Sequence, residues 1–329
     1  MRTPAMDTII EEAPTSKSSD LTMNRSKAFA VAIGAVGIVG FFADYINLRS
    51  SVTRHLRVEE PIRMASNRPI MTTFFEPVEG GCCGMTKQGH DNLVDSWKRA
   101  WEGRGWETRI FTEVDARKHP DFEVLQNKLI EAKVSEYDRR CFWRWLAMAV
   151  DDSPRGGWMS DYDLFPLTLT GERGLELMKQ PGFKSYGGQV PALIHSDQES
   201  WDKVVQMMIK IVSPTIDLDF ISDMMLLLYL HQHYSEEELG ITAWEFSIWK
   251  KLPYIRVDGQ EDPKIDCEVV RTHLAAHLSH RAVQEGFEVS RTYPKIKEEI
   301  KEGEYAEFRA QAADVMMKDV DQCLESSVE

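Results

Sequence analysis

Cysteine is scarce in this chain, and its spacing excludes several classes of protein. Five cysteines occur among 329 residues. Two of them are adjacent and three stand alone, so the Cys-x-x-Cys spacing of zinc sites and thiol-disulfide enzymes is missing. Five cysteines are also too few for a disulfide-rich scaffold. In an oxidising compartment they can form one or two bridges and leave an odd thiol.

Positive charge is also in short supply. The chain has 39 lysines and arginines against 53 aspartates and glutamates, which gives a net charge of −14. A protein that binds a phosphate backbone needs clustered basic residues to release counterions, and no such cluster follows residue 70. We therefore expect no nucleic acid partner. Hydrophobic residues make up 43% of the chain, which is enough to bury a sizeable core.

Long hydrophobic runs are rare, but one lies near the start of the chain. Residues 28–43 read AFAVAIGAVGIVGFFA without a charged side chain, and Leu48 extends the apolar character. As a helix, this run spans about 24 Å, close to the roughly 30 Å bilayer core. A cleaved signal peptide fits less well, because Phe41-Phe42-Ala43 is not a small-x-small cleavage site. A buried helix of a soluble domain more often carries polar residues on one face.

We therefore expect a membrane anchor in front of a folded domain. The sequence predicts a cytoplasmic tail over residues 1–27, a transmembrane signal anchor over 28–48 and a short polar stem over 49–69. This arrangement is typical of a type II membrane protein of the Golgi or endoplasmic reticulum, with the domain after the stem in the lumen.

The folded part opens with a strand, a helix and a second strand. Residues 70–78 are β-branched and aromatic and end at a proline-containing turn, which predicts a strand. Apolar residues recur at helical spacing over residues 90–105, and a second strand is predicted over 106–113. This order indicates a parallel βαβ unit.

Further helices and one short strand follow. Helices are predicted over residues 121–132 and 136–150, and a strand over 158–161. More helical segments come next, at residues 171–181, 201–212 and 222–234, and a strand is predicted near residues 253–257. We expect a single α/β domain over 70–290, with a mixed sheet flanked by helices, and a C-terminal helical extension over 291–329.

Two aspartates follow the predicted strand at residues 158–161. Asp161 and Asp163 are one residue apart, so on a strand their side chains begin on the same side. At the carboxyl end of a parallel strand they would reach the crevice where α/β sheets bind ligands. Two carboxylates there suit Mg²⁺ or Mn²⁺. Gly156 and Gly157 permit a close approach of the chain, and Pro166 is expected to end the strand. The alternative is an exposed turn.

The helix before this strand is rich in arginine. The segment from Tyr137 to Trp145 contains three arginines among large apolar residues. Surface ion pairing would explain isolated arginines, but Arg140 and Arg144 lie four residues apart and would repel each other. An arginine pair directed at an anionic ligand explains both.

Taken together, these segments resemble a known family. A helix carrying Asp and Arg, then a glycine pair, a hydrophobic strand and Asp-x-Asp, here GGWMSDYD from Gly156, is similar to the DXD glycosyltransferases with the GT-A fold. The branch it resembles contains the yeast outer-chain mannosyltransferase and the sugar-transferring clostridial toxins. The resemblance implies a GT-A-like, Rossmann-like sheet. The chain departs from the pattern at Met159, where a tyrosine is usual, and in the spacing that follows Asp138.

The resemblance implies roles for individual residues. Asp163 would bind the divalent metal, and Asp161 would contact the ribose or the water shell of the metal. Asp138, with Arg140 or Arg144, would hold the donor sugar and diphosphate. The donor site would also include Tyr162 and Phe74.

A late histidine completes the metal site in many such enzymes. His280 is our first choice and His277 our second, with His273 as a third candidate, while the alternative for each is an ordinary surface or core histidine. Asp219 and Asp223 precede an apolar helix, and we expect one of them to cap it; contact with acceptor or donor sugar is the alternative.

The implied reaction is transfer of a sugar from a nucleotide-diphosphate donor, such as a UDP- or GDP-sugar, to a hydroxyl of a glycan, protein or lipid. Mn²⁺ or Mg²⁺ is the expected cofactor, and retention of anomeric configuration is expected from the branch. Two alternatives stay open. One is an inactive, membrane-tethered transferase-like protein, and the other is a Mg²⁺-dependent phosphohydrolase or nucleotidyltransferase.

Overall fold

The structure is a computed structural model that describes residues 68–77, 84–151, 157–218, 220–239, 241–255, 263–280, 282–283 and 305–326. All of them belong to one compact unit, Ser66–Glu329. The predicted tail (1–27), anchor (28–48) and nearly all of the stem (49–69) lie outside the described residues, as do Gly156 and Asp219. Among the described residues, no helix has the length and apolar character needed to cross a membrane.

A six-stranded mixed sheet forms the centre of the unit. Its strands lie in the order β2 (Glu107–Phe111), β1 (Ile70–Phe74), β3 (Gly157–Ser160), β6 (Leu193–Ser196), β5 (Phe183–Ser185) and β7 (Ile241–Trp244). Strand β1 pairs in parallel with both β2 and β3, whereas β6 runs antiparallel to β3 and β5. The predicted mixed α/β sheet and the parallel βαβ unit are therefore confirmed.

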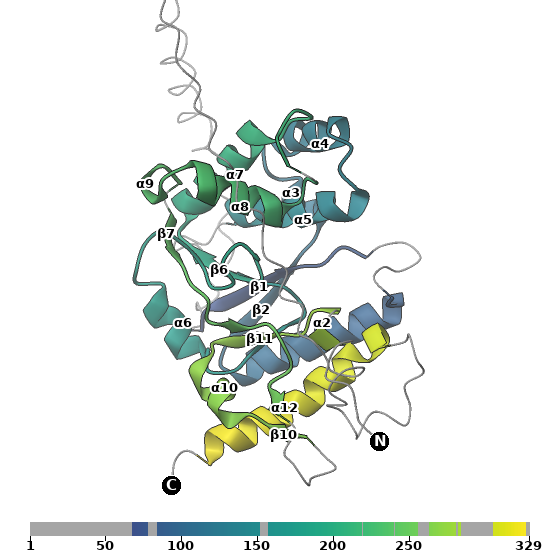
Figure 1. Cartoon of the computed structure of the whole chain (residues 1–329), viewed down its shortest axis with the longest axis vertical. Helices are drawn as coiled ribbons and strands as arrows, with labels where there is room; N and C mark the ends of the chain where they lie inside the picture. Colours follow the sequence, from purple (N-terminus) through teal and green to yellow (C-terminus); the bar gives the residue numbers. More distant parts are fainter. Residues whose placement is uncertain are drawn as a thin grey trace, which may run out of the picture. The chain divides into compact units, whose positions relative to one another are not determined.

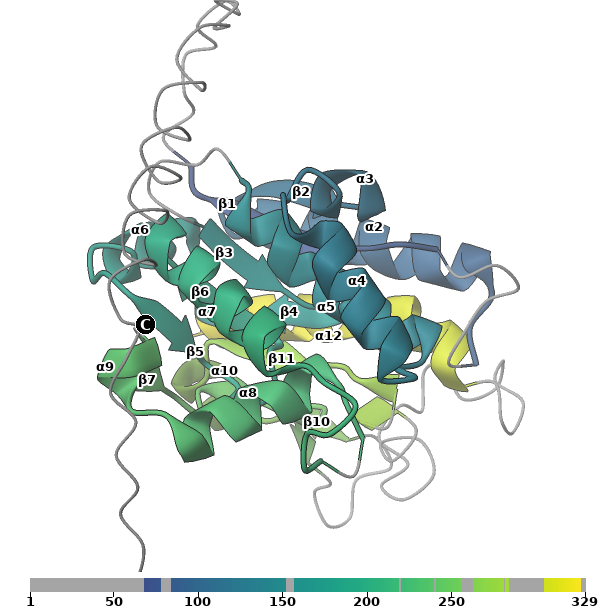
Figure 2. The ribbon, with the colours of Figure 1, turned by 90° about the horizontal axis from the view of Figure 1, so that it is seen from above.

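Side chains that alternate across the strands build a core on each face of the sheet. In β3, Trp158 packs into one apolar cluster and Met159 into the other, and in β6 Leu193 and Ile194 divide in the same way. The second cluster is covered by α3 (Glu113–Ala116), α4 (Phe122–Glu131), α5 (Glu136–Ala149), α7 (Gln198–Ile211) and α8 (Asp223–His233). Figures 1 and 2 show these helices on one side of the sheet.

The opposite face is covered by α2 (Lys87–Gly103), which follows the predicted helical periodicity closely. The Thr86 side chain accepts a hydrogen bond from the Gly89 amide and caps the helix, which begins at Lys87, three residues before its predicted start. Buried Trp97 and Trp101 face the sheet, and their indole N–H groups donate to Ser160 Oγ and the Leu164 carbonyl. The chain around β3 is thereby fixed to α2.

The Asp-x-Asp segment lies in a turn rather than on a strand. Strand β3 ends at Ser160, and the Leu164 amide donates to the Asp161 carbonyl across the turn. The chain then enters β4 (Leu164–Pro166), which pairs antiparallel with β11 (Ala275–His277). Strand β11 pairs in parallel with β8 (Ile248–Trp249) in this second sheet. Two expectations were therefore wrong: strand alternation does not align the aspartates, and Pro166 ends β4 instead of β3.

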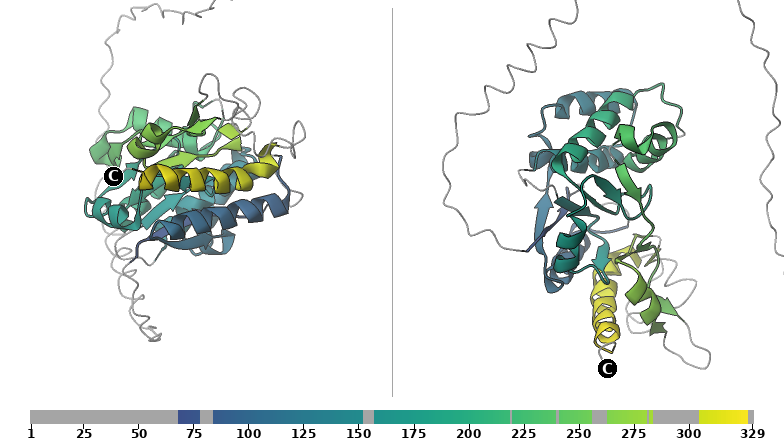
Figure 3. Two further views of the ribbon diagram at one scale, coloured as in Figure 1. Left: turned by 90° about the horizontal axis from the view of Figure 1, so that it is seen from below. Right: turned by 90° about the vertical axis from the view of Figure 1, so that its left-hand side faces the viewer.

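The last helix belongs to the core of the unit. Helix α12 (Arg309–Glu325) lies beside α2, as Figure 3 shows, and buries Ala312, Ala313 and Met316 in the same apolar cluster as Trp97. A disulfide between Cys267 and Cys323 joins it to α10 (Cys267–Thr272). The predicted C-terminal extension thus contributes to the domain. The remaining elements are α6 (Gly171–Leu177), α9 (Glu236–Leu239), β9 (Tyr254–Ile255), β10 (Lys264–Ile265) and η1 (Tyr305–Phe308).

Candidate metal centre

A cavity of about 500 Å³ lies at the carboxyl ends of β1 and β3. Ligands of α/β proteins commonly bind at this edge of the sheet, where the strands end and loops diverge. The end of β1, the helix α5, the turn after β3 and the start of α8 all contribute to its wall. The charged residues, histidines and serines of the wall are Glu76, His90, Asp138, Arg140, Arg144, Asp161, Asp163, Ser222, Asp223, His277, Ser279, His280 and Arg309.

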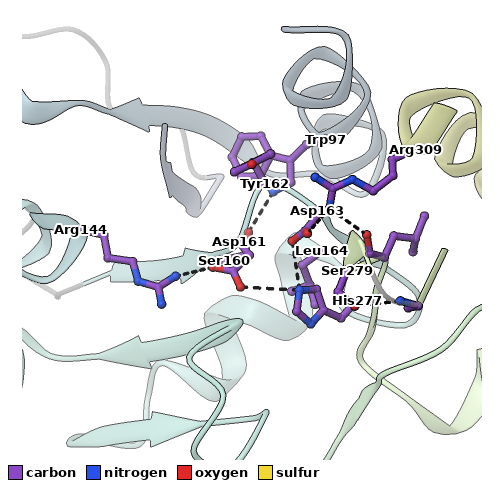
Figure 4. Close-up of polar contacts among 12 residues, drawn as sticks. Trp97, Arg144, Ser160, Asp161, Tyr162, Asp163, Leu164, His277, Ser279 and Arg309 are labelled. Atoms are coloured by element: carbon purple, nitrogen blue, oxygen red, sulfur yellow. Dashed lines mark hydrogen bonds and ion pairs between the residues drawn. The ribbon is translucent and has the colours of Figure 1, made fainter. Parts of the chain in front are cut away.

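Three of these side chains could hold a metal ion together. Ligand atoms of Asp161, Asp163 and His277 all lie within 4.8 Å of one another, and we call these three residues the metal group. His277 Nε2 is 3.1 Å from Asp163 Oδ1 and 3.7 Å from Asp161 Oδ2. Figure 4 shows the imidazole facing both carboxylates.

Pairing in the second sheet brings His277 to the aspartates. His277 lies opposite Leu164 in the β4–β11 register, and the Leu278 amide donates to the Asp163 carbonyl over 2.8 Å. The main-chain pairing of β4 and β11 therefore holds His277 close to Asp163, although the two residues are 114 positions apart in the sequence.

Each aspartate also binds an arginine through its other oxygen. Arg144 Nη1 donates to Asp161 Oδ1, and Arg309 Nη1 donates to Asp163 Oδ2 over 2.7 Å. Arg309 is only 3% exposed, and its other nitrogens lie against the sulfur of Met85. Figure 4 shows the two arginines approaching the turn from different sides.

Arg144 is itself held by a third carboxylate. Its Nε lies 2.9 Å from Asp223 Oδ2, which also accepts a hydrogen bond from Trp145 Nε1 over 3.0 Å. Asp223 is 4% exposed and begins helix α8. The helix cap itself is Ser222, whose hydroxyl accepts from the Met225 amide, so the expectation that an aspartate caps this helix was wrong.

Burial and neighbouring charges set the protonation of the three candidate ligands. Burial raises the pKa of Asp161, with the Asp163 carboxylate adding to the effect against the opposing charge of Arg144. Burial also opposes ionisation of Asp163, but His277 and Arg309 outweigh it and lower its pKa to about 2. For His277, burial is opposed by the Asp163 and Asp161 carboxylates, which raise its pKa. Asp163 is thus an anion at neutral pH.

The chemistry of these ligands fits a divalent transition metal. Carboxylate oxygens suit Mg²⁺, Ca²⁺ and Mn²⁺, whereas an imidazole nitrogen is a common ligand of first-row transition metals. Two oxygens and one nitrogen therefore match Mn²⁺, the expected cofactor, better than they match Ca²⁺. Three protein ligands also leave positions for a substrate.

Most of the predicted donor-site residues line the same cavity. Phe74 and Tyr162 are in its wall, and the Tyr162 hydroxyl lies 3.3 Å from His90 Nδ1. Asp138 is in the first turn of α5, where its side chain accepts from the hydroxyl of the capping residue Ser135. The two candidate arginines have different positions, since Arg144 contacts the Asp-x-Asp turn and Arg140 does not.

Arg140 instead binds the chain that follows β1. Its Nη1 donates to the carbonyls of Glu76 and Pro77, over 3.2 and 2.7 Å, and its Nη2 lies 2.6 Å from Glu136. It also lines the cavity.

The histidine nearest to the carboxylates is our second choice. His280 is in the cavity wall, but the metal group contains His277. His273 lies elsewhere, with Nδ1 3.0 Å from the Val269 carbonyl. Sequence reasoning missed Arg309 altogether, because it stands in an ordinary charged helix that has no local link to the Asp-x-Asp turn.

Comparison with known proteins identifies the family of the chain. Residues 58–310 match a family described as a domain of unknown function, DUF8765, and the chain belongs to that family. The matched region includes the metal group and both arginines that bind it. No curated protein matches the chain.

Proposed function

We propose that this protein is a metal-dependent glycosyltransferase that uses a nucleotide-diphosphate sugar. The observation that supports the proposal most directly is the convergence of Asp161, Asp163 and His277 in a cavity at the carboxyl ends of β1 and β3. A volume of about 500 Å³ is in the range of sites for ligands of nucleotide size.

In this proposal the chain holds the donor from two sides. Asp161, Asp163 and His277 would hold Mn²⁺, or Mg²⁺, and the ion supplies positive charge to the diphosphate when bound. Arg140 and Asp138 also line the cavity and would bind the rest of the donor. Phe74 and Tyr162 supply apolar surface there.

The reaction breaks the bond between the anomeric carbon and the diphosphate oxygen and forms a bond to an acceptor hydroxyl. The proton of that hydroxyl leaves to the departing nucleoside diphosphate or to solvent, so we assign no protein base. Positive groups near the leaving diphosphate stabilise the charge that develops on it. The acceptor would be a glycan, protein or lipid hydroxyl, and transfer would retain anomeric configuration, as in the branch that the sequence resembles.

The compartment forms part of the proposal. The disulfide between Cys267 and Cys323 supports an oxidising environment. It agrees with the proposed lumenal position of this domain behind an anchor over residues 28–48, in the Golgi or the endoplasmic reticulum.

A donor panel tests the proposal. The full chain is incubated with MnCl₂ and separate UDP- and GDP-sugars, and release of nucleoside diphosphate is measured with and without candidate acceptors. We expect release with at least one donor, and its loss both in EDTA and in the Asp163→Asn variant. Asp314→Asn is the matched control, because Asp314 is a carboxylate on the outer side of α12 that pairs with Arg99.

One observation favours the alternative of an inactive transferase-like protein. Both aspartates are already paired with buried or partly buried arginines, as structural ion pairs are. If no donor and no Mn²⁺ binds to the folded chain, the transferase proposal is rejected in favour of this alternative. A phosphohydrolase would instead cleave the diphosphate of the donor with water and release a nucleoside monophosphate and a sugar phosphate. A nucleotidyltransferase would leave the panel unchanged and would release pyrophosphate only from an added nucleoside triphosphate and sugar phosphate.

A further inference from the structure

The two arginines at the metal group bind it in the same manner. Each aspartate gives one oxygen to a guanidinium, Asp161 Oδ1 to Arg144 and Asp163 Oδ2 to Arg309. The second oxygen of each, Asp161 Oδ2 and Asp163 Oδ1, faces His277 Nε2 at 3.7 and 3.1 Å. Each carboxylate therefore directs only one of its two oxygens at the candidate metal position.

The number of oxygens that a carboxylate offers affects which ion it prefers. Ca²⁺ takes six to eight oxygen ligands and often binds a carboxylate through both oxygens. Mg²⁺ demands six ligands in a tight octahedron, and Mn²⁺ accepts the imidazole nitrogen that His277 offers. A site in which each carboxylate offers the metal only one oxygen therefore disfavours Ca²⁺.

Arg309 is suited to enforce this restriction. It is 3% exposed, and Met85 and the Leu278 carbonyl contact its guanidinium, so it has little room to swing away from Asp163. It is the first residue of α12. Two ion pairs, Asp314 with Arg99 and Asp321 with Arg104, hold this helix against α2 and its C-terminal end. Rotation of the Asp163 carboxylate toward bidentate binding would break the hydrogen bond to Arg309.

We propose that Arg309 is a specificity-determining residue that holds Asp163 to a single metal-facing oxygen and thereby selects Mn²⁺ over Ca²⁺. This inference rests on the proposed metal site at Asp161, Asp163 and His277. Arg309 would act through Asp163 and not as a metal ligand, so its role is that of a positioning residue.

The test is a comparison of metal affinities without nucleotide. MnCl₂ and CaCl₂ are titrated separately into the full chain by calorimetry, for the wild type, Arg309→Met and Arg309→Lys. Loss of a positive charge strengthens binding of every divalent cation, so the quantity to compare is the ratio of the two dissociation constants. We expect Arg309→Met to reduce the preference for Mn²⁺ about tenfold, and Arg309→Lys, which keeps a donor and the charge, to reduce it less.

The matched control is Arg99→Met, which removes another ion pair between α2 and α12 away from the metal group. Its metal preference should equal that of the wild type. An unchanged Mn²⁺/Ca²⁺ ratio in folded Arg309→Met overturns the role of Arg309 and leaves the proposed function standing. If the wild type binds neither ion, the metal site and this inference are rejected, and the donor panel decides the proposed function separately.

A second measurement uses only the wild type, in case Arg309→Met does not fold. Infrared difference spectra between the Mn²⁺-loaded and metal-free protein report carboxylate binding, because the antisymmetric and symmetric stretches separate more widely for one-oxygen than for two-oxygen coordination. A wide separation supports the inference. A narrow separation contradicts it even where Mn²⁺ binds.

Discussion

Arg309 donates a hydrogen bond to Asp163 over 2.7 Å, although the two residues are 146 positions apart in the sequence. Arg309 is the first residue of α12, and Cys323 near the other end of this helix is bonded to Cys267 in α10. The geometry of the candidate site therefore depends on how firmly the C-terminal helix is attached.

The disulfide should contribute substantially to stability. It closes a loop with a sequence separation of 56, which corresponds to about 2–4 kcal/mol of stabilisation through the lost entropy of the unfolded chain. We expect the double variant Cys267→Ser/Cys323→Ser to lose this amount of unfolding free energy and so to unfold at a lower denaturant concentration. Dithiothreitol should bring the wild type to the same midpoint and leave the double variant unchanged. Equal stability of wild type and variant under oxidising conditions would contradict the prediction.

Removal of Asp223 should destabilise the fold more than removal of an exposed partner. Asp223→Ala leaves the Arg144 guanidinium buried without one of its two carboxylates, and breaking a buried pair costs about 3–5 kcal/mol. Glu136→Ala, which breaks the exposed pair with Arg140, should cost at most about 1 kcal/mol. Urea unfolding followed by circular dichroism measures both. Similar losses in the two variants would show that Arg144 does not depend on Asp223.

Two glycine positions should respond oppositely to alanine. A Cβ at Gly174 would overlap the indole ring of Trp106, which is fully buried, so Gly174→Ala should cost about 1–3 kcal/mol by overpacking. A Cβ at Gly103, the last residue of α2, meets no atom within 4 Å. Gly103→Ala should therefore be neutral or stabilise by up to about 1 kcal/mol, because alanine favours the helix. The thermal unfolding midpoints of the two variants, each compared with that of the wild type, test both predictions.

Stability should fall in mild acid because of His195. Burial first, and the Lys184 charge second, lower the pKa of His195 to about 4 from its usual 6.5. Between pH 6.5 and 4 the unfolded chain binds this proton and the folded chain does not, so stability rises with pH across that window and is fully present above it. The full effect is on the order of 3 kcal/mol.

His195→Gln should lose this part of the pH dependence, whereas His233→Gln, at an exposed position, should keep it. Chemical denaturation at pH 7.5, 6, 5 and 4.5 gives the free energy of unfolding, and its slope against pH is compared among the three proteins. Because other titrating groups act equally in all three proteins, the difference between the slopes isolates His195. Parallel slopes for wild type and His195→Gln would refute the assignment.

Local sequence signals were sufficient for the first half of the sheet. The helical spacing of Leu93, Val94, Trp97 and Trp101 predicts α2, and the runs on either side predict β1 and β2 in parallel. These elements are recoverable because neighbouring residues determine both their periodicity and their boundaries. The Asp-x-Asp motif is also visible in the sequence, and its two carboxylates do line the same cavity, but a turn and not strand alternation brings them there.

The rest of the site depends on contacts that no local pattern encodes. Strands β4 and β11 have three residues each, too few to show alternation, so their pairing and the position of His277 could not be read from the sequence. Arg309 likewise reaches Asp163 only because α12 packs on α2. The sequence does not show whether His277 or His280 lies nearer to the aspartates, because this depends on the β4–β11 register.

The distance of Arg309 from Asp163 along the chain also has a consequence for biosynthesis. At about 5–20 residues per second, a ribosome adds Arg309 roughly 7–30 s after Asp163. During that interval the Asp163 carboxylate lacks its guanidinium partner, and for most of it β4 also lacks its pairing partner β11. Arg144 precedes Asp161 in the chain, so of the two ion pairs at the turn the one between Asp163 and Arg309 is the later to become possible.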